Sequence, residues 1–196
     1  MARFEIVHPI SDAVLTVQTK RLLLSVLKPA ATDRVTDYLV RNRAFHKPFQ
    51  QRHGNEYFTA PEQKAYLKSD LRQYKQGTQV GFWISTIEDP DRIIGRISFY
   101  SLIGGAMMTC FVGYHIDEKE QGKGYITEAL KAGSDFMFKY YRLHRIQADI
   151  LPTNERSQAV VEKSGFVKMG YNLRYMEIDG SYKDHVMYVL LNSSVE

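Results

Sequence analysis

The chain has 196 residues, of which 44% are hydrophobic and 24% charged, and its formal net charge is +4. These values predict a globular protein with one domain over residues 1–196. The basic residues are too sparse along the sequence for a nucleic-acid-binding surface, and no apolar run approaches the roughly 18 residues of a membrane span. A single cysteine, Cys110, predicts a cytoplasmic location without disulfides, and six histidines without ligand spacing predict no metal site.

The first quarter of the chain predicts two strands, a helix and a loop. The strands are expected over 10–17 and 21–27, and the helix over 30–42. Because Pro48 disfavours helical geometry at the residue before it, a loop is expected over 42–49. Four side chains of this loop could line an acceptor pocket or, equally well, form a hydrophobic plug between helices: Asn42, Phe45, His46 and Phe49.

The middle of the chain predicts a helix followed by three strands that run back and forth. The expected ranges are 62–74 for the helix and 80–87, 93–102 and 109–116 for the strands. Pro61 suits the first turn of that helix. Gly95 could form a bulge in the second strand.

The next stretch organises the whole chain. Apolar residues recur at three- and four-residue steps and predict a helix over 126–141. Its start carries two glycines and a lysine where a capping Ser, Thr, Asp or Asn is usual. The first N–H groups of a helix lack intrahelical partners and carry partial positive charge, so this junction predicts an anion site, most naturally for phosphate. Gly122 and Gly124 let the backbone approach the anion closely.

Two common phosphate-binding motifs do not fit this junction. Gly124 stands where a P-loop requires Ser or Thr, and Thr127 stands where the dinucleotide fingerprint requires its third glycine. An ordinary surface turn with two glycines stays open as the alternative.

The C-terminal part predicts a strand, a helix and a hairpin. The strand is expected over 145–151, and the helix starts at Thr153 or Asn154 as its cap. Gly165 suits a left-handed helix stop. The hairpin strands are expected over 166–178 and 182–191. The order of elements is that of an α+β, or mixed α/β, fold.

Several motifs resemble those of the GNAT (Gcn5-related N-acetyltransferase) superfamily. Residues 121–126 resemble its [QR]-x-x-G-x-[GA] motif, with Ile126 in place of Gly or Ala, and residues 154–157 with 162–166 resemble N-x-x-S and E-K-x-G-F. From about residue 20 to 189 the chain is similar to the RimJ/RimL branch, most of all to the RimJ type, which acetylates the N-terminal alanine of a small-subunit ribosomal protein. The resemblance implies a central, mostly antiparallel sheet flanked by helices.

The resemblance also implies acetyl-coenzyme A (acetyl-CoA) as a cosubstrate, which the acceptor amine attacks directly in a ternary complex. The residues implied to hold it lie on one strand, on the glycine-containing junction and on the later helix that begins near Asn154. They are Tyr114, His115, Ile116, Gln121, Gly122, Lys123, Gly124, Tyr125, Ile126, Asn154 and Lys163. Lys123 and Lys163 could equally well be surface lysines.

Two catalytic roles are implied, and one of them stays open. Ser157 is expected to protonate the departing sulfur, unless it is only a polar residue of a helix start. The positions where relatives carry a glutamate that acts as the general base correspond here to Cys110 and Met176. Water, Tyr175, Glu177 or His115 could therefore accept the proton, and Tyr175 is taken as the candidate.

The expected acceptor is the N-terminal amine of a ribosomal protein, with association to the ribosome as a further expectation and a monomer or homodimer as the assembly. Two alternatives stay open: an acetyltransferase for a small amine or an antibiotic, and a non-catalytic module that binds the ribosome or its RNA. Because a chain of charge +4 repels a basic protein tail, local acidic residues must receive its amine.

Overall fold

The structure, a computed structural model, describes residues 4–195. Within this range nine strands form one sheet in the order β1-β2-β3-β4-β5-β6-β7-β9-β8, and every neighbouring pair is antiparallel except β6 with β7. The strands are β1 (Glu5–Val7), β2 (Ala13–Gln18), β3 (Leu22–Leu27), β4 (Val80–Thr86), β5 (Gly95–Ile103), β6 (Thr109–Ile116), β7 (Arg145–Ile150), β8 (Val167–Ile178) and β9 (Ser181–Leu191). The predicted mixed α+β class and mostly antiparallel sheet are confirmed.

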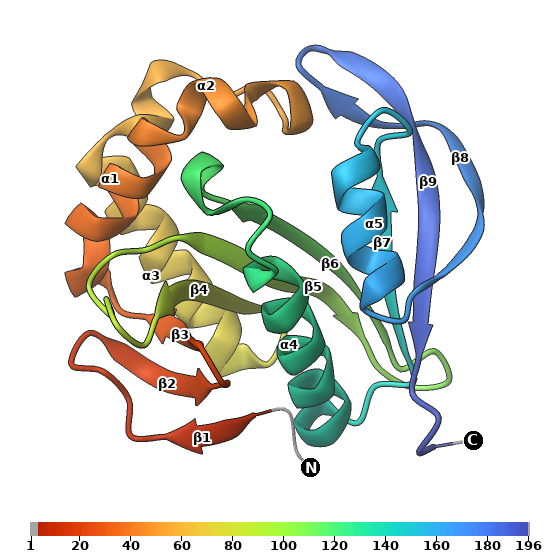
Figure 1. Cartoon of the computed structure of the whole chain (residues 1–196), viewed down its shortest axis with the longest axis horizontal. Helices are drawn as coiled ribbons and strands as arrows, with labels where there is room; N and C mark the ends of the chain where they lie inside the picture. Colours follow the sequence, from red (N-terminus) through yellow and green to blue (C-terminus); the bar gives the residue numbers. More distant parts are fainter. Residues whose placement is uncertain (1–3, 196) are drawn as a thin grey trace.

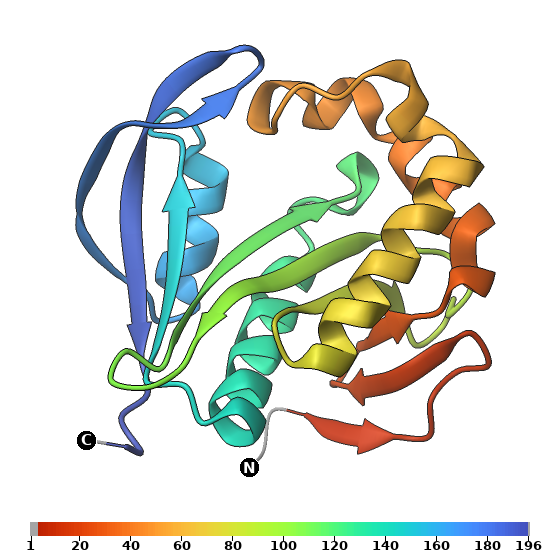
Figure 2. The same cartoon turned by 180° about the vertical axis from the view of Figure 1, so that it is seen from behind.

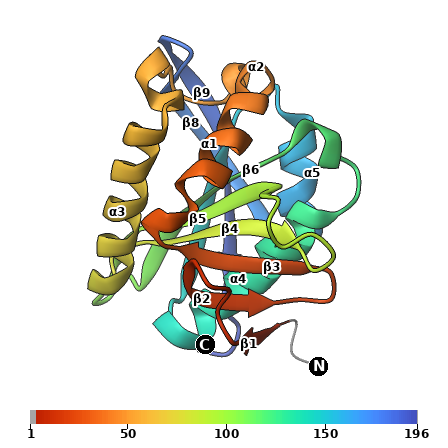
Figure 3. The same ribbon diagram turned by 90° about the vertical axis from the view of Figure 1, so that its left-hand side faces the viewer.

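Helices lie on both faces of the sheet (Figure 1). They are α1 (Thr32–Arg41), α2 (Arg43–His46), α3 (Ala60–Gln76), α4 (Tyr125–Tyr141) and α5 (Glu155–Lys163), with short 3₁₀ turns η1 (Pro29–Ala31), η2 (Lys47–Phe49), η3 (Asn55–Phe58) and η4 (Glu118–Glu120). Seen from the side, α1 and α3 lie on one face of the sheet and α4 and α5 on the other (Figure 3). None of the helices in the described range is long and apolar enough to cross a bilayer.

Strand alternation divides the buried side chains between these two faces. On β5, Ile97 and Phe99 join the core under α4 and α5, while on β4 the ring of Trp83 packs with α1 and α3. Helix α4 approaches the sheet closely because Gly133 faces the ring of Phe99, where a Cβ would lie 2.9 Å from Cε2. The apolar residues that recur at three- and four-residue steps over 126–141 therefore form the buried face of α4.

The segment predicted as a loop over 42–49 is helical, so that prediction is wrong. It forms α2 and η2, and Pro48 occupies the first turn of η2, where a missing N–H costs no hydrogen bond. The N–H of His46 also bonds the carbonyl of Asn42 over 2.9 Å, which continues the helical path from α1.

The bulge predicted at Gly95 is also wrong. Gly95 pairs in regular register with Ile84 and Ile116, and the irregularity in β5 lies between Tyr100 and Ile103. A side chain at Gly95 would instead bring its Cβ within 2.8 Å of the carbonyl oxygen of His115. Close packing of two strands, and not a bulge, explains this glycine.

The ends of α5 follow the predicted signals. The side chain of Asn154 accepts a hydrogen bond of 3.1 Å from the N–H of Ser157, which identifies Asn154 as the cap. At the other end Gly165 has φ +95°, and its N–H and that of Phe166 bond the carbonyls of Glu162 and Val161. The two predictions are confirmed and fix the orientation of α5 beside β7.

Candidate active site

The junction before α4 has the geometry of an anion site. Gly122 and Gly124 take left-handed φ values of +75° and +77°, and Gly124 stands at the helix cap without any side-chain capping bond. Across residues 121–127, all within the described part of the chain, no N–H group has a protein hydrogen-bond partner. These free N–H groups at the positive end of a 17-residue helix suit a phosphate or pyrophosphate. We call residues 121–126 the phosphate loop.

Two side chains hold the phosphate loop in place. Arg21 donates to the carbonyl of Lys123 over 3.0 Å and pairs with Glu128 over 2.7 Å. Thr19 donates to the same carboxylate over 2.7 Å. Burial opposes the ionisation of Glu128, but the bonds from Thr19 and Arg21 lower its pKa overall. The loop is thus braced from the turn between β2 and β3 without the use of its own N–H groups.

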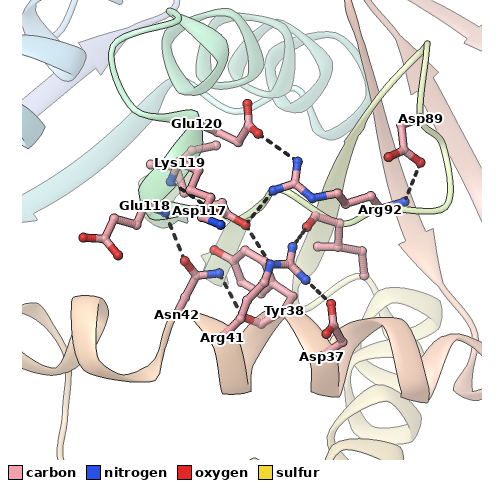
Figure 4. A network of polar contacts seen from close by, with 12 residues as sticks. Asp37, Tyr38, Arg41, Asn42, Asp89, Arg92, Asp117, Glu118, Lys119 and Glu120 are labelled. Atoms are coloured by element: carbon pink, nitrogen blue, oxygen red, sulfur yellow. Dashed lines mark hydrogen bonds and ion pairs between the residues drawn. The ribbon is translucent and has the colours of Figure 1, made fainter.

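A network of charges supports the other side of the loop (Figure 4). Asp117, whose side chain is 3% exposed, pairs with Arg41 over 2.8 Å and Arg92 over 3.1 Å. Arg92 continues to Glu120 over 2.8 Å, and Glu120 pairs with Lys123 over 2.7 Å. We call these five residues the Asp117 network; it links α1 to the phosphate loop.

The carboxylates of this network are held ionised. Burial alone raises the pKa of Asp117, but hydrogen bonds from Arg41 and from the N–H of Lys119 bring it below its usual value. Burial likewise opposes ionisation of Glu120, and Lys123 and Arg92 lower its pKa overall. The stabilisation from both groups is therefore present above their ordinary pKa and is lost as the pH falls through the lowered values.

Strands β6 and β7 separate next to the phosphate loop. Their pairing ends at Phe111 and Gln147, after which β6 follows β5 and β7 follows β9. We call the diverging parts, 112–116 of β6 and 148–150 of β7, the β6–β7 fork. Backbone groups freed by such a divergence can pair with the amides of an extended ligand arm.

On the α5 side of the fork, two hydroxyl groups meet. Ser157 Oγ donates to the hydroxyl of Tyr114 over 2.8 Å, and that hydroxyl donates to the backbone carbonyl of Ser157 over 2.9 Å. Burial raises the pKa of the Tyr114 phenol, so it stays protonated at neutral pH. The structure thus brings Ser157 and Tyr114 together at the fork, where a departing thiolate could take a proton.

The predicted residues of β6 and α2 form a second set of contacts. Nδ1 of His115 and the hydroxyl of Tyr38 are 2.6 Å apart, and His46 donates from Nε2 to the carbonyl of Ile116 over 2.8 Å. Asn42 is buried and bonds the carbonyl of Tyr38 and the N–H of Glu118. Both amide groups of Asn42 are thereby used within the fold.

The histidines of this set are poor proton acceptors. Burial lowers the pKa of His46, and burial with the neighbouring His46 and Arg96 lowers the pKa of His115 further. A neutral His115 can accept a proton only weakly, because its conjugate acid is disfavoured. The role of His115 as the general base stays a prediction, and its lowered pKa disfavours that role.

The remaining predicted acceptor residues lie nearer to the surface. Phe45 is half-buried beside His46, and Phe49 is 44% exposed on η2. The β8–β9 tip reaches η2, where the N–H of Asp179 bonds the carbonyl of Gln50 over 3.3 Å. A groove of about 560 Å³ runs beneath this contact, lined by Pro48, Leu151, Pro152, Thr153, Arg174, Ile178, Asp179, Ser181, Tyr182, Lys183 and Asp184.

The face of the fork opposite α5 carries a carboxylate that the sequence analysis did not identify. Asp149 accepts from Gln147 over 2.9 Å and from Asn172 over 2.9 Å. Burial and the nearby Asp149 both raise the pKa of Tyr175, the predicted base, which makes that phenol a weaker acid. Asp149 escaped prediction because only the pairing of β7 with β9, and of β9 with β8, places it beside Tyr175.

The two lysines predicted to bind the coenzyme differ in their contacts, and their roles stay predictions. Lys123 is paired with Glu120, and Lys163 is exposed at the opposite end of α5 from Asn154. Cys110 is buried in the core, and burial raises its pKa to about 12, so its thiol is unreactive. Among residues 4–195, no three His, Cys, Asp or Glu side chains are placed to hold a metal ion.

Comparison with known proteins agrees with this geometry. Residues 21–167 match the family model described as Acetyltransferase (GNAT) domain. The chain is 35% identical over 155 residues to Probable N-acetyltransferase YjcK of Bacillus subtilis (strain 168), covering 79% of this chain and 85% of that one. It is 34% identical over 174 residues to [Ribosomal protein uS5]-alanine N-acetyltransferase of Escherichia coli (strain K12), covering 88% of both chains.

A solved structure shows the same arrangement of elements. The crystal structure of ribosomal-protein-S5-alanine acetyltransferase from Vibrio fischeri has a TM-score of 0.87 to this chain. Sequence identity to it is 28%, and the match covers 92% of this chain and 98% of that one.

Proposed function

This chain belongs to the GNAT family of acetyl-CoA-dependent N-acetyltransferases, and from this premise we propose that its acceptor is the N-terminal amine of a protein. The finer proposal is an alanine at the start of a small-subunit ribosomal protein. A purely non-catalytic ribosome- or RNA-binding module, one of the alternatives from the sequence, is thereby set aside. Association with the ribosome remains part of the proposal.

The observation that carries the proposal is the extent of similarity to the uS5-alanine enzyme. The shared region covers 88% of each chain, so it reaches far beyond the phosphate loop and α5. The phosphate loop serves the donor and cannot distinguish acceptors. Similarity that also includes much of the acceptor side supports a related acceptor.

The donor side of the chain fits acetyl-CoA, which supplies an activated acetyl group on sulfur. The free N–H groups of residues 121–127 can bind its pyrophosphate, and the diverging β6 backbone over 112–116 can pair with its pantetheine amides. In this proposal the Ser157–Tyr114 pair at the fork gives a proton to the departing thiolate. Because a thiol is acidic, with an ordinary pKa near 8.5, this proton donation assists the reaction but is not essential.

Acceptor competition tests the proposal. Peptides that begin with Ala or Ser should be acetylated with a far higher kcat/KM than spermidine or an aminoglycoside, and the same peptides with an acetylated N-terminus should not react. Mass spectrometry of the product should place the new acetyl group on the α-amine. If the small amines turn over faster, the protein acceptor is wrong, although the acetyltransferase family is unaffected.

Ribosome association has its own measurement. Binding through several RNA phosphates weakens steeply with salt, with log K falling linearly in log salt concentration. The small net charge of +4 predicts a shallow slope and therefore recognition mainly through the protein substrate. A steep slope would show that RNA contacts dominate the association.

A further inference from the structure

Asp149 is a shielded carboxylate that, within the described residues, has no cationic partner, in contrast to five others. Ion pairs to Arg or Lys are made by the carboxylates of Asp12, Asp70, Asp117, Glu120 and Glu128. Within residues 4–195 Asp149 is half-buried and forms no ion pair. A half-buried carboxylate that is hydrogen-bonded but has no cationic partner is a candidate for binding a cation in function.

The position of Asp149 places it at the mouth of the fork. It lies two residues beyond Gln147, where the β6–β7 pairing ends. Side chains alternate along β7, so Ile146 and Ala148 face the α4–α5 core while Asp149 faces the opposite side. This is the face on which α3 lies, and no helix covers β7 there (Figure 2). The groove under the β8–β9 tip begins nearby, at Leu151.

Two aromatic pairs line the surroundings of Asp149. The rings of Tyr100 and Phe111 stack with centroids 5.8 Å apart, and those of Tyr175 and His185 meet edge to face at 5.9 Å. The ring of Tyr100 reaches over the fork, because a Cβ on Gly113 would lie 3.7 Å from its Cε1. A carboxylate flanked by aromatic rings is a favourable receptor for an ammonium group.

We propose that Asp149, with its flanking aromatic rings, forms the site that binds the protonated primary amine of the acceptor and takes its proton before attack. The proposal rests on the proposed N-terminal acceptor and names the residue that receives it. A small primary amine would use the same site, so the site does not depend on which acceptor is correct.

The proton balance of the step is simple. The acceptor ammonium gives one proton to an oxygen of Asp149 and becomes a neutral amine. Its nitrogen then forms a bond to the thioester carbon, the carbon–sulfur bond breaks, and the thiolate receives one proton from the Ser157–Tyr114 pair. That pair recovers a proton from the newly formed amide nitrogen through solvent, and Asp149 releases its proton to water.

The electrostatics around Asp149 agree with this role. Burial raises the pKa of Asp149, while Gln147 and Asn172 oppose part of that shift. The charged or titratable groups that act on it are His185 of β9, Arg145 of β7, Tyr175 of β8 and Tyr100 of β5. A carboxylate with a raised pKa is a better proton acceptor near neutrality than an ordinary Asp.

Asp149→Asn tests the proposal with a nearly isosteric side chain. With a peptide that begins with Ala, kcat/KM at pH 7 should fall about 100-fold, the lower range for general acid–base catalysis. The loss should shrink to less than about tenfold at pH 9, because an α-amine with an ordinary pKa near 8 is then mostly neutral without help. CoA affinity and melting temperature should remain those of the wild type.

Two further variants guard the interpretation. Asp91→Asn removes one negative charge from a side chain that is 96% exposed, and it should leave kcat/KM unchanged. Asp149→Glu restores a carboxylate and should recover part of the activity at pH 7. Wild-type activity in a folded Asp149→Asn protein, or a loss that is equal at pH 7 and pH 9, would overturn the proposal.

The outcome also separates this proposal from that of a protein acceptor. If Asp149→Asn reduces acetylation of both the peptide and spermidine, the ammonium site is supported whichever acceptor is preferred. If the wild type acetylates the peptide and Asp149→Asn does so equally well, the acceptor proposal stands and the ammonium site fails.

Discussion

Asp117 and Asp149 lie on two strand ends beside the same fork, and their surroundings are opposite. Asp117 is buried between two arginines, and the hydrogen bonds from Arg41 and from the N–H of Lys119 hold its pKa below the usual value (Figure 4). Asp149 is met only by neutral amides and phenols at close range, and burial raises its pKa. One carboxylate is therefore fixed as an anion, and the other remains able to accept a proton.

This difference teaches how one sheet serves two purposes. A fully paired carboxylate holds the geometry of a loop because breaking its contacts is costly. A carboxylate without a cationic partner keeps its proton affinity and can exchange a proton with a substrate. The donor side of this enzyme carries the first kind and the acceptor side carries the second.

Breaking the Asp117 network should have the largest effect. Asp117→Asn leaves Arg41 and Arg92 without their shared carboxylate, and we expect the free energy of unfolding at pH 7 to fall by about 2–3 kcal/mol. This is less than the roughly 3–5 kcal/mol for breaking a fully buried pair, because both arginines keep other acceptors and are partly exposed. Urea denaturation measures the change, with the same m-value (the dependence of the free energy of unfolding on urea concentration) used for both proteins.

Asp37→Asn is the matched control, because Asp37 pairs with the same Arg41 but is 70% exposed. It should cost less than about 0.5 kcal/mol, as surface pairs do. The wild type should also lose stability as the pH falls through the lowered pKa of Asp117, and the Asp117→Asn variant should lose less over that range. Equal costs for the two variants would contradict the distinction between buried and exposed pairs.

The phosphate loop gives the next largest effect. Gly124→Val places a β-branched residue at φ +77°, where space is available but the backbone is strained. The loop should relax away from its anion-binding geometry, and the dissociation constant for CoA should rise at least tenfold, about 1.4 kcal/mol. Calorimetry measures this constant directly.

Gly105→Val separates strain from binding. Gly105 has φ +65° and open space around its Cβ position, but it lies in the turn before β6 and away from the loop. It should lower the melting temperature as much as Gly124→Val does and leave CoA affinity unchanged. Equal affinity in both variants would remove Gly124 from the coenzyme site.

Local signals in the sequence were sufficient for the donor side. The glycines of the phosphate loop, the Asn154 cap and the Gly165 stop each act within a few residues, so short motifs reveal them. The acyl donor site, which most of the motifs touch, is therefore accessible from sequence together with a resemblance to a family.

The acceptor side depends on contacts between distant residues. Asn42 was expected to face the acceptor, but its two amide groups bond Tyr38 and the N–H of Glu118, and the second contact is 76 residues away. The neighbours of Asp149 come from β5, β8 and β9, whose register no local pattern specifies. Helix α2 was expected as a loop because the restriction before Pro48 was weighed without the packing of His46 on β6.

Changing the solvation of Asp149 should have a smaller, directional effect. Gln147 donates to both oxygens of Asp149 and so favours its ionised form. Gln147→Leu should raise the pKa of Asp149 further, which shifts the acidic limb of the kcat/KM profile to higher pH by up to about one unit. In the Asp149→Asn background the same change should shift nothing. A limb that moves to lower pH would contradict the assignment.

Ser157 extends the comparison to the other side of the fork and should show the smallest effect. If Ser157 protonates the departing sulfur, Ser157→Ala should lower kcat by about tenfold or less, because a thiolate needs little acid assistance. The dissociation constant for CoA should stay nearly unchanged. Ser164→Ala is the matched control. Ser164 lies at the C-terminal end of α5 and donates to the carbonyl of Val160, far from the fork, so its loss should change only stability.

Tyr114 decides how that proton is held. The hydroxyl of Ser157 donates its hydrogen bond to the phenol of Tyr114. To protonate the sulfur, the Ser157 hydroxyl must therefore rotate toward it, and Tyr114 can then return a proton to Ser157. Tyr114→Phe removes that partner and frees Ser157 Oγ, so it should change kcat less than Ser157→Ala does if Ser157 is the donor. A larger loss in Tyr114→Phe would transfer the donor role to the phenol. A wild-type kcat in Ser157→Ala, together with a lowered melting temperature, would leave Ser157 only its structural contact at the start of α5.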